Sequence, residues 1–156
     1  MKKSFIVKII SFLFIFLFIY AAASKFIDFQ KFRVELGQSP LLTAMADWIA
    51  WIVPILEIFI SALLAAQKFR LAGLYASFSL MVIFTAYIIT ITHFSEYIPC
   101  SCGGILATLT WNQHLIFNLA FVLLGIIGVL LSPMPTKLIF NKNLLQQYKE
   151  KEKPKT

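Results

Sequence analysis

The sequence predicts an all-α integral membrane protein, folded as a four-helix bundle. Of its 156 residues, 60% are hydrophobic and 13% are charged, whereas a soluble globular chain is about 45–50% apolar and about 25% charged. Four apolar runs, each free of Lys and Arg, hold most of the apolar excess. Because only helices and closed barrels satisfy their own backbone polar groups in lipid, we expect four transmembrane helices. This composition excludes an ordinary soluble enzyme.

We expect helices over residues of about 5–24, 48–67, 71–92 and 113–132. They form one membrane domain, residues 1–136, and a basic tail follows over residues 137–156. The first run is short for a bilayer, but the stems of flanking lysines such as Lys25 can reach the interface and lengthen the span. The second run contains Pro54 and, one helical turn later, Glu57, a carboxylate near the middle of a span.

The basic residues predict the orientation of these helices. Eleven of the 14 Lys and Arg residues precede the first helix, join the second to the third, or follow the fourth. By the positive-inside rule, both termini are cytoplasmic and the protein lies in the bacterial inner membrane. The loop between the third and fourth helices is then on the outer face. The net charge of +7 indicates topology and affinity for anionic membrane lipid, and no nucleic-acid partner is expected.

The N-terminus has one alternative interpretation, a cleavable signal peptide. Lys2 and Lys3 precede an apolar run that ends in Ala-Ala-Ala-Ser, residues 21–24, which resembles a cleavage site. The run is long and aromatic and continues directly into a charged segment, so we expect the helix to be retained. Cleavage would leave three helices in the same orientation.

The first outer loop predicts a short amphipathic helix at the membrane interface. Apolar side chains recur at near-helical spacing, at Phe26, Phe29, Phe32 and Leu36. We expect Gly37 and Pro40 to break this helix. It could be a lid that shields the helix ends from water or a docking surface for a partner, and the pattern favours the lid.

The second outer loop carries both cysteines of the chain, Cys100 and Cys102. Pro99 before them stiffens the backbone, and Gly103 and Gly104 after them allow another chain to approach closely. The outer compartment is oxidising, and a disulfide within a C-x-C sequence is strained and therefore easily reduced. These features favour a redox-active pair, while a structural or incidental pair stays open.

A metal site is the third possibility for this loop. Two sulfur and two nitrogen ligands lie on the loop or at its edges, in Cys100, Cys102, His93 and His114. Zinc accepts such a set, and Cu(I) accepts two thiolates. C-x-C is tighter than the usual zinc spacing, however, and nothing fixes the two histidines, so we predict no metal.

Polar side chains within the spans predict a pocket beneath the cysteine loop. Glu57 is costly in lipid unless it is protonated or paired, and His114 and Asn118 share one face of the fourth helix. Lys25 closes the first helix on the same side. Hydroxyls from the third helix could join them, at Tyr87, Thr90 and Thr92. The set could relay a proton, hold a quinone headgroup, or simply lock the helices together by hydrogen bonds.

Three motifs in this order resemble the DoxX/MauE superfamily of four-helix membrane proteins, and within it the MauE branch. They are Ala-Ala-Ser-Lys-Phe at residues 22–26 with Asp28, Pro-Ile-Leu-Glu at 54–57, and Pro-Cys-Ser-Cys-Gly at 99–103. The resemblance covers about residues 5–131. It implies redox roles for Cys100 and Cys102 and pocket roles for Lys25 and Glu57. Where an aromatic residue often follows the second cysteine in the family, this chain has Gly103.

The resemblance also implies a function. MauE proteins are associated with maturation of the disulfide-rich small subunit of methylamine dehydrogenase, beside a thioredoxin-like partner, and DoxX relatives are linked to quinone-coupled oxidoreduction. We therefore expect thiol/disulfide exchange at the outer face with a thioredoxin-like periplasmic protein or an exported client. The alternatives are a non-catalytic assembly subunit and a subunit of a quinone-coupled oxidoreductase. A membrane quinone is the cofactor that these hypotheses allow.

Overall fold

The computed structural model describes residues 2–39, 42–94 and 110–132. Within these residues the secondary structure is entirely helical, so the predicted all-α class is confirmed for them. A 3-10 turn, η1, covers Thr43–Met45. The α-helices are α1 (Lys2–Ile27), α2 (Phe29–Gln38), α3 (Ala46–Ala65), α4 (Arg70–Phe94) and α5 (Trp111–Leu131).

Four of these helices, α1, α3, α4 and α5, are long and apolar enough to cross a membrane, so the chain is a multi-pass membrane protein. Large apolar side chains on their outer faces are exposed, as lipid-facing residues should be. Examples are Phe12 at 67%, Trp48 at 72% and Leu130 at 77% exposure. The first helix extends past the expected residues 5–24 at both ends and includes Lys25.

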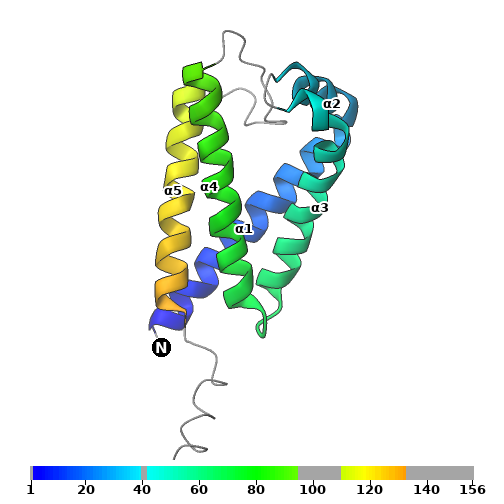
Figure 1. The fold of residues 1–156 in the computed structure, drawn as a ribbon. Coiled ribbons are helices and arrows are strands. Elements are labelled where there is room, and N and C mark those ends of the chain that lie inside the picture. The colour runs from blue at the N-terminus through cyan, green and yellow to red at the C-terminus, as the bar shows by residue number, and fades with distance from the viewer. Residues whose placement is uncertain (1, 40–41, 95–109, 133–156) are drawn as a thin grey trace, which may run out of the picture.

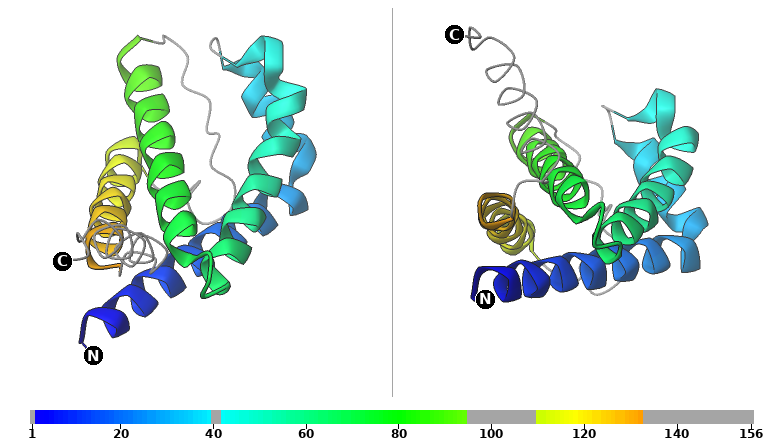
Figure 2. Two further views of the ribbon diagram at one scale, coloured as in Figure 1. Left: turned by 60° about the horizontal axis from the view of Figure 1, so that its bottom comes forward. Right: turned by 90° about the horizontal axis from the view of Figure 1, so that it is seen from below.

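The spanning helices alternate in direction, and they pack as two pairs. α1 lies against α3, and α4 runs beside α5, while α3–α4 and α1–α5 contacts join the pairs (Figure 1). α1 crosses the bundle obliquely, which is clearest from below (Figure 2). The start of α1, the α3–α4 turn and the end of α5 therefore lie at one end, and α2 lies at the other. Which end faces the cytoplasm stays a prediction.

The centre of the bundle is apolar and aromatic. Phe14 and Phe18 of α1 are fully buried, and the ring of Phe14 meets that of Phe121 edge to face, 5.3 Å between centroids. Edge-to-face pairs are a favourable arrangement of aromatic rings. This contact fixes α1 against α5. Other fully buried apolar residues are Leu64, Leu74 and Ile91. Leu64 of α3 lies beside Gly73 of α4, and Leu74 of α4 lies beside Gly128 of α5.

Hydroxyl side chains inside the bundle bond back into their own helices. Ser77 Oγ donates a hydrogen bond to the Gly73 carbonyl at 2.7 Å, and Thr85 Oγ1 donates one to the Met81 carbonyl at 2.7 Å. Ser11 and Ser61 do the same. In lipid a hydroxyl without a partner is costly, and a carbonyl one turn earlier is always within reach. These residues therefore fit an apolar interior without joining the helices to one another.

α2 is the short amphipathic helix that the sequence predicts, although Phe26 of the expected pattern belongs to α1, and its position at the membrane interface stays a prediction. Phe32 and Leu36 are each 4% exposed and pack on Ala46 and Ala50 at the start of α3. Burial on this helix raises the pKa of the Glu35 carboxyl. The expected break at Gly37 is wrong, because α2 continues through it to Gln38.

An exposed ion pair connects α2 to α3. Arg33 Nε donates a hydrogen bond to the Asp47 carboxylate. This bond, together with the charge of Asp47, holds the pKa of the Arg33 guanidinium above its usual value. Because both side chains are solvent-exposed, the pair adds little stability.

The first turn of α4 passes close to the end of α3 at Gly73, and this close approach gives the first prediction. A Cβ at Gly73 would lie 2.9 Å from the backbone nitrogen of Leu64, which cannot move without disturbing α3. We expect Gly73→Ala to lower the free energy of unfolding by about 1–3 kcal/mol through overpacking. Thermal unfolding in detergent measures the change. Gly37→Ala is the matched control, since a Cβ there meets nothing within 4 Å. Equal melting temperatures of the two variants would contradict the prediction.

Candidate functional site

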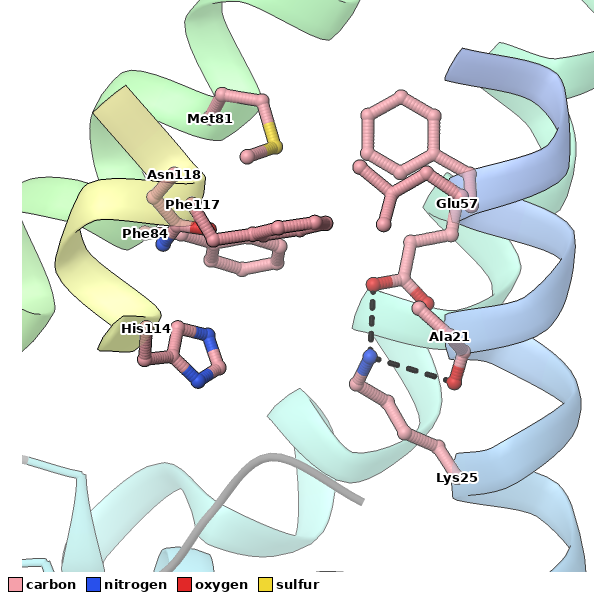
Figure 3. Close-up of a pocket in the computed structure, with 10 residues that line it drawn as sticks. Ala21, Lys25, Glu57, Met81, Phe84, His114, Phe117 and Asn118 are labelled. Atoms are coloured by element: carbon pink, nitrogen blue, oxygen red, sulfur yellow. Dashed lines mark hydrogen bonds and ion pairs between the residues drawn. The ribbon is translucent and has the colours of Figure 1, made fainter. Parts of the chain in front are cut away.

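Four polar residues from three helices line one small cavity inside the bundle. Lys25 comes from the last turn of α1, Glu57 from the middle of α3, and His114 and Asn118 from the first two turns of α5. The cavity has a volume of about 50 Å³. In Figure 3, His114 and Asn118 lie on one side of it, and Lys25 and Glu57 lie on the other. We call it the polar cavity. The predicted pocket residues thus lie together.

A buried ion pair forms one wall of the polar cavity. Lys25 Nζ donates to Glu57 Oε1 at 2.8 Å and to the Ala21 carbonyl at 3.4 Å. The two side chains are 11% and 1% exposed. The same Nζ lies 5.7 Å from the centroid of the Phe32 ring, so α2 also covers it. Lys25 therefore turns inward to a carboxylate, although its place at the end of a span suggested that it reaches the interface.

The local sequence explains how these groups come to face each other. α1 and α3 pack closely and run in opposite directions, so the end of α1 lies beside the N-terminal half of α3. On α5, the backbone N–H of Thr110 donates to Gln113 Oε1 at 3.0 Å, which caps the start of the helix. His114 and Asn118, four residues apart, then point to the same side as expected.

Two buried polar atoms in the polar cavity have no hydrogen-bond partner among the described residues. They are Glu57 Oε2, an acceptor, and Asn118 Nδ2, a donor. Glu57 is fully buried and Asn118 is 4% exposed. Buried polar atoms are almost always hydrogen-bonded, to protein or to a bound molecule. Glu57 and Asn118 therefore each bury one polar atom beside the polar cavity at an energetic cost.

Three aromatic rings also line the polar cavity, beside Leu17, Ala21 and Met81, and none of the three was predicted from the sequence. They come from Phe18 on α1, Phe84 on α4 and Phe117 on α5. Phe117 follows His114 by three residues and precedes Asn118, so helical spacing could have placed it on this face. Among sixteen Phe residues, however, nothing in the sequence distinguishes these three.

A larger cavity adjoins the polar one and is almost entirely apolar. It has a volume of about 350 Å³ and lies between α2, α3 and α4, and we call it the apolar cavity. Four residues line both cavities, namely Lys25, Phe84, His114 and Asn118. Apolar side chains form most of its wall, including Leu36, Val53, Leu56, Leu80, Ile83 and Ile88. The two cavities are thus neighbours, one lined by the polar residues and the other almost entirely by apolar ones.

The hydroxyls predicted to join the pocket divide into two groups. Tyr87 lines the apolar cavity, and its hydroxyl donates to Ser39 Oγ at 3.0 Å, which connects α4 to the end of α2. Thr90 and Thr92 bond back to carbonyls of α4 at 2.8 Å and line neither cavity. Their assignment to the pocket is therefore wrong.

Cys100 and Cys102 lie outside the described residues, so their predicted redox role stays a prediction. Of the two histidines weighed as metal ligands, His93 is exposed at the end of α4 and His114 is buried in α5. Across the described ranges, no three His, Cys, Asp or Glu side chains gather as a metal site would require.

The buried ion pair gives the second prediction. Lys25→Met leaves the Glu57 carboxylate buried and uncompensated, and we expect it to cost about 3–5 kcal/mol of unfolding free energy. The double variant Lys25→Met with Glu57→Met should recover most of that loss, because both charges are gone. Thermal unfolding of both single variants and the double variant in detergent gives a double-mutant cycle, which measures the coupling free energy between Lys25 and Glu57. If the two single losses simply add in the double variant, the pair does not contribute as a unit.

Comparison with known proteins agrees with the motifs in the sequence. No curated protein and no solved structure matches the chain. The family model described as "methylamine utilisation protein MauE" matches residues 3–131, which include all four spanning helices and both cysteines. The resemblance noted from the sequence is thereby confirmed. The chain belongs to the MauE family.

Proposed function

We propose that this protein is an inner-membrane component of methylamine utilisation that exchanges thiols and disulfides at its outer face. Its role would be to support disulfide formation in an exported client such as the small subunit of methylamine dehydrogenase. The observation that carries the proposal is membership of the MauE family over residues 3–131. The C-x-C pair, Cys100 and Cys102, lies within that match.

The chemistry is a balanced exchange between two dithiol–disulfide pairs. The thiolate of one cysteine attacks a disulfide of a thioredoxin-like partner, so that one S–S bond breaks and a mixed disulfide forms. The second cysteine attacks this mixed bond and releases the partner as a dithiol, leaving a Cys100–Cys102 disulfide. The reverse sequence delivers a disulfide to a client. Protons lost by the attacking thiols pass to the thiolates that leave.

The arrangement of the bundle supports this proposal. α4 ends and α5 begins at the same end of the bundle, where α2 also lies. The segment that contains the cysteines joins these two helix ends. Lys25 and His114 are at the same end of the interior, beneath α2. A loop attached there suits a partner that approaches from outside the membrane.

The third prediction tests the orientation. A membrane-impermeant thiol reagent applied to intact, reduced spheroplasts should label the protein, because eleven of 14 basic residues place the cysteine loop outside. Mass spectrometry locates the label on Cys100 or Cys102. Labelling of the double Cys→Ser variant would indicate a non-specific reaction. Labelling that requires permeabilised membranes would reverse the topology and remove the exchange mechanism.

The fourth prediction tests the exchange itself. Cys100→Ser and Cys102→Ser should each abolish client maturation without lowering the melting temperature, since the sequence places both residues in the loop between the third and fourth predicted spans. One of them should accumulate a mixed disulfide with a partner, visible on a non-reducing gel. Ser101→Ala, between the two cysteines, is the matched control and should behave as wild type. Full activity of both single cysteine variants would favour a non-catalytic assembly subunit instead.

A further inference from the structure

We propose that one exposed face of α4 binds α4 of a second copy of this chain, so that the protein forms a parallel, two-fold symmetric dimer in the membrane. The residues of this face cover about 100° of the helix circumference, and we call it the α4 face. They are Ala72, Tyr75, Ser79, Val82, Ile83 and Ala86. The inference is independent of the proposed function, because it uses neither cysteine.

Ser79 distinguishes the α4 face from the rest of the lipid-facing surface. It is exposed and follows Arg70, at the start of α4, by nine residues. At about 1.5 Å per residue it lies about 14 Å along the helix, which is near the middle of a hydrocarbon layer about 30 Å thick. In the central parts of the described spans, every exposed side chain except Ser79 is apolar. These parts are residues 9–20, 52–62, 76–89 and 116–130.

Ser79 also lacks the hydrogen bond that comparable hydroxyls in the bundle make. Ser77 and Thr85, on the same helix, each donate to a carbonyl one turn earlier at 2.7 Å, and Ser11 and Ser61 do so on α1 and α3. Ser79 makes no hydrogen bond within the part of the chain that the structure describes. A polar group without a partner is costly in lipid. Because a hydroxyl both donates and accepts, the Ser79 hydroxyl of a second copy satisfies it.

The centre of the α4 face is shallow, which suits close helix packing. Ala72, Ser79 and Ala86 are seven residues apart, so these small side chains lie almost in line along the helix. Tyr75 is 55% exposed on one side of this line, and Ile83 is 61% exposed on the other. Small residues let two membrane helices approach closely. The large side chains of one copy can then pack into the shallow centre of the other, at a crossing angle of about 20°.

The distribution of charge agrees with a second copy as the partner. Residues at the centre of a two-fold interface meet their own counterparts, so a charged face would repel itself. Arg70 is the only Lys, Arg, Asp or Glu residue of α4. It projects to the side of the helix opposite Ser79, at nine residues' separation, and donates to the Leu64 carbonyl of α3 at 3.4 Å. The α4 face is therefore neutral.

The orientation of the copies also favours a second copy. All copies lie in one membrane in the same orientation, so their α4 helices are parallel and Ser79 meets Ser79 at equal depth. Any other helix would have to offer a polar group at that depth, and a second copy always does. Such a dimer also carries both cysteine loops on one side of the membrane, because α4 runs the same way in each copy.

Cysteine cross-linking in membranes tests the contact. In the Cys100→Ser/Cys102→Ser background, Ser79→Cys and Ala86→Cys should each give a disulfide-linked dimer on a non-reducing gel after oxidation with copper phenanthroline, since their counterparts lie within disulfide reach. Ala62→Cys on α3 and Ala120→Cys on α5 are the matched controls, because both replace exposed small residues in other spans. They should stay monomeric. Equal cross-linking of all four variants would indicate random collision and overturn the inference.

Energy transfer between differently labelled copies in lipid vesicles measures the strength of dimerisation. We expect the transfer to fall reversibly as lipid dilutes the protein. Ala86→Leu fills the shallow centre of the α4 face and should weaken dimerisation by about tenfold, whereas Ala120→Leu, the same change on α5, should have no effect. Ser79→Ala keeps the small volume but removes the hydroxyl, and should weaken dimerisation by about three- to tenfold. None of these positions is buried, so the melting temperature of the monomer should not change.

Three further outcomes would overturn the inference. They are a wild-type protein that is monomeric at every dilution, dimerisation of Ala86→Leu or Ser79→Ala as strong as that of wild type, and a Ser79→Cys protein that cross-links in native membranes to a different protein alone. The Cys100→Ser/Cys102→Ser variant separates this inference from the proposed function, since it should dimerise as wild type does while it loses thiol exchange.

Discussion

The arrangement of the whole site depends on one buried ion pair, Lys25 Nζ to Glu57 Oε1 at 2.8 Å. A carboxylate in the middle of a span is costly unless it is protonated or paired, and the partner of Glu57 comes from another helix, α1. The pair therefore fixes the end of α1 against the middle of α3. It uses one Glu57 oxygen, and the other is buried without a hydrogen-bond partner among the described residues. The same contact thus holds two helices together and leaves a buried acceptor free.

Packing around that pair is uneven, and the cavities follow from this. In the half of the bundle away from α2, large rings and close glycine contacts fill the interior, with Phe14 against Phe121 and Gly128 against Leu74. In the half near α2, α3 and α4 are separated by the apolar cavity. α2 covers that half through Phe32 and Leu36, and the Tyr87–Ser39 hydrogen bond attaches its end to α4. The lid interpretation of the first outer loop agrees with this placement.

Much of the fold could be predicted from the sequence, because hydrophobic runs and helical spacing are local properties. The four spans, the amphipathic α2 and the shared face of His114 and Asn118 belong to this group. Contacts between helices could not be predicted. The sequence placed Lys25 and Glu57 in one pocket and left pairing open as one fate of the carboxylate, but only the packing of α1 on α3 shows the ion pair. Thr90 and Thr92 were misassigned because a hydroxyl in lipid can bond its own helix.

The length and slope of α1 connect the ion pair to the membrane itself. Its 26 residues, at about 1.5 Å per residue, give a helix about 39 Å long, and the hydrocarbon layer is only about 30 Å thick. α1 runs obliquely across the other helices (Figure 1), which is one way in which a long helix fits a thin layer. Because a long helix adjusts to bilayer thickness by tilting, and Lys25 lies in the last turn of α1, we expect lipid chain length to act on the Lys25–Glu57 contact.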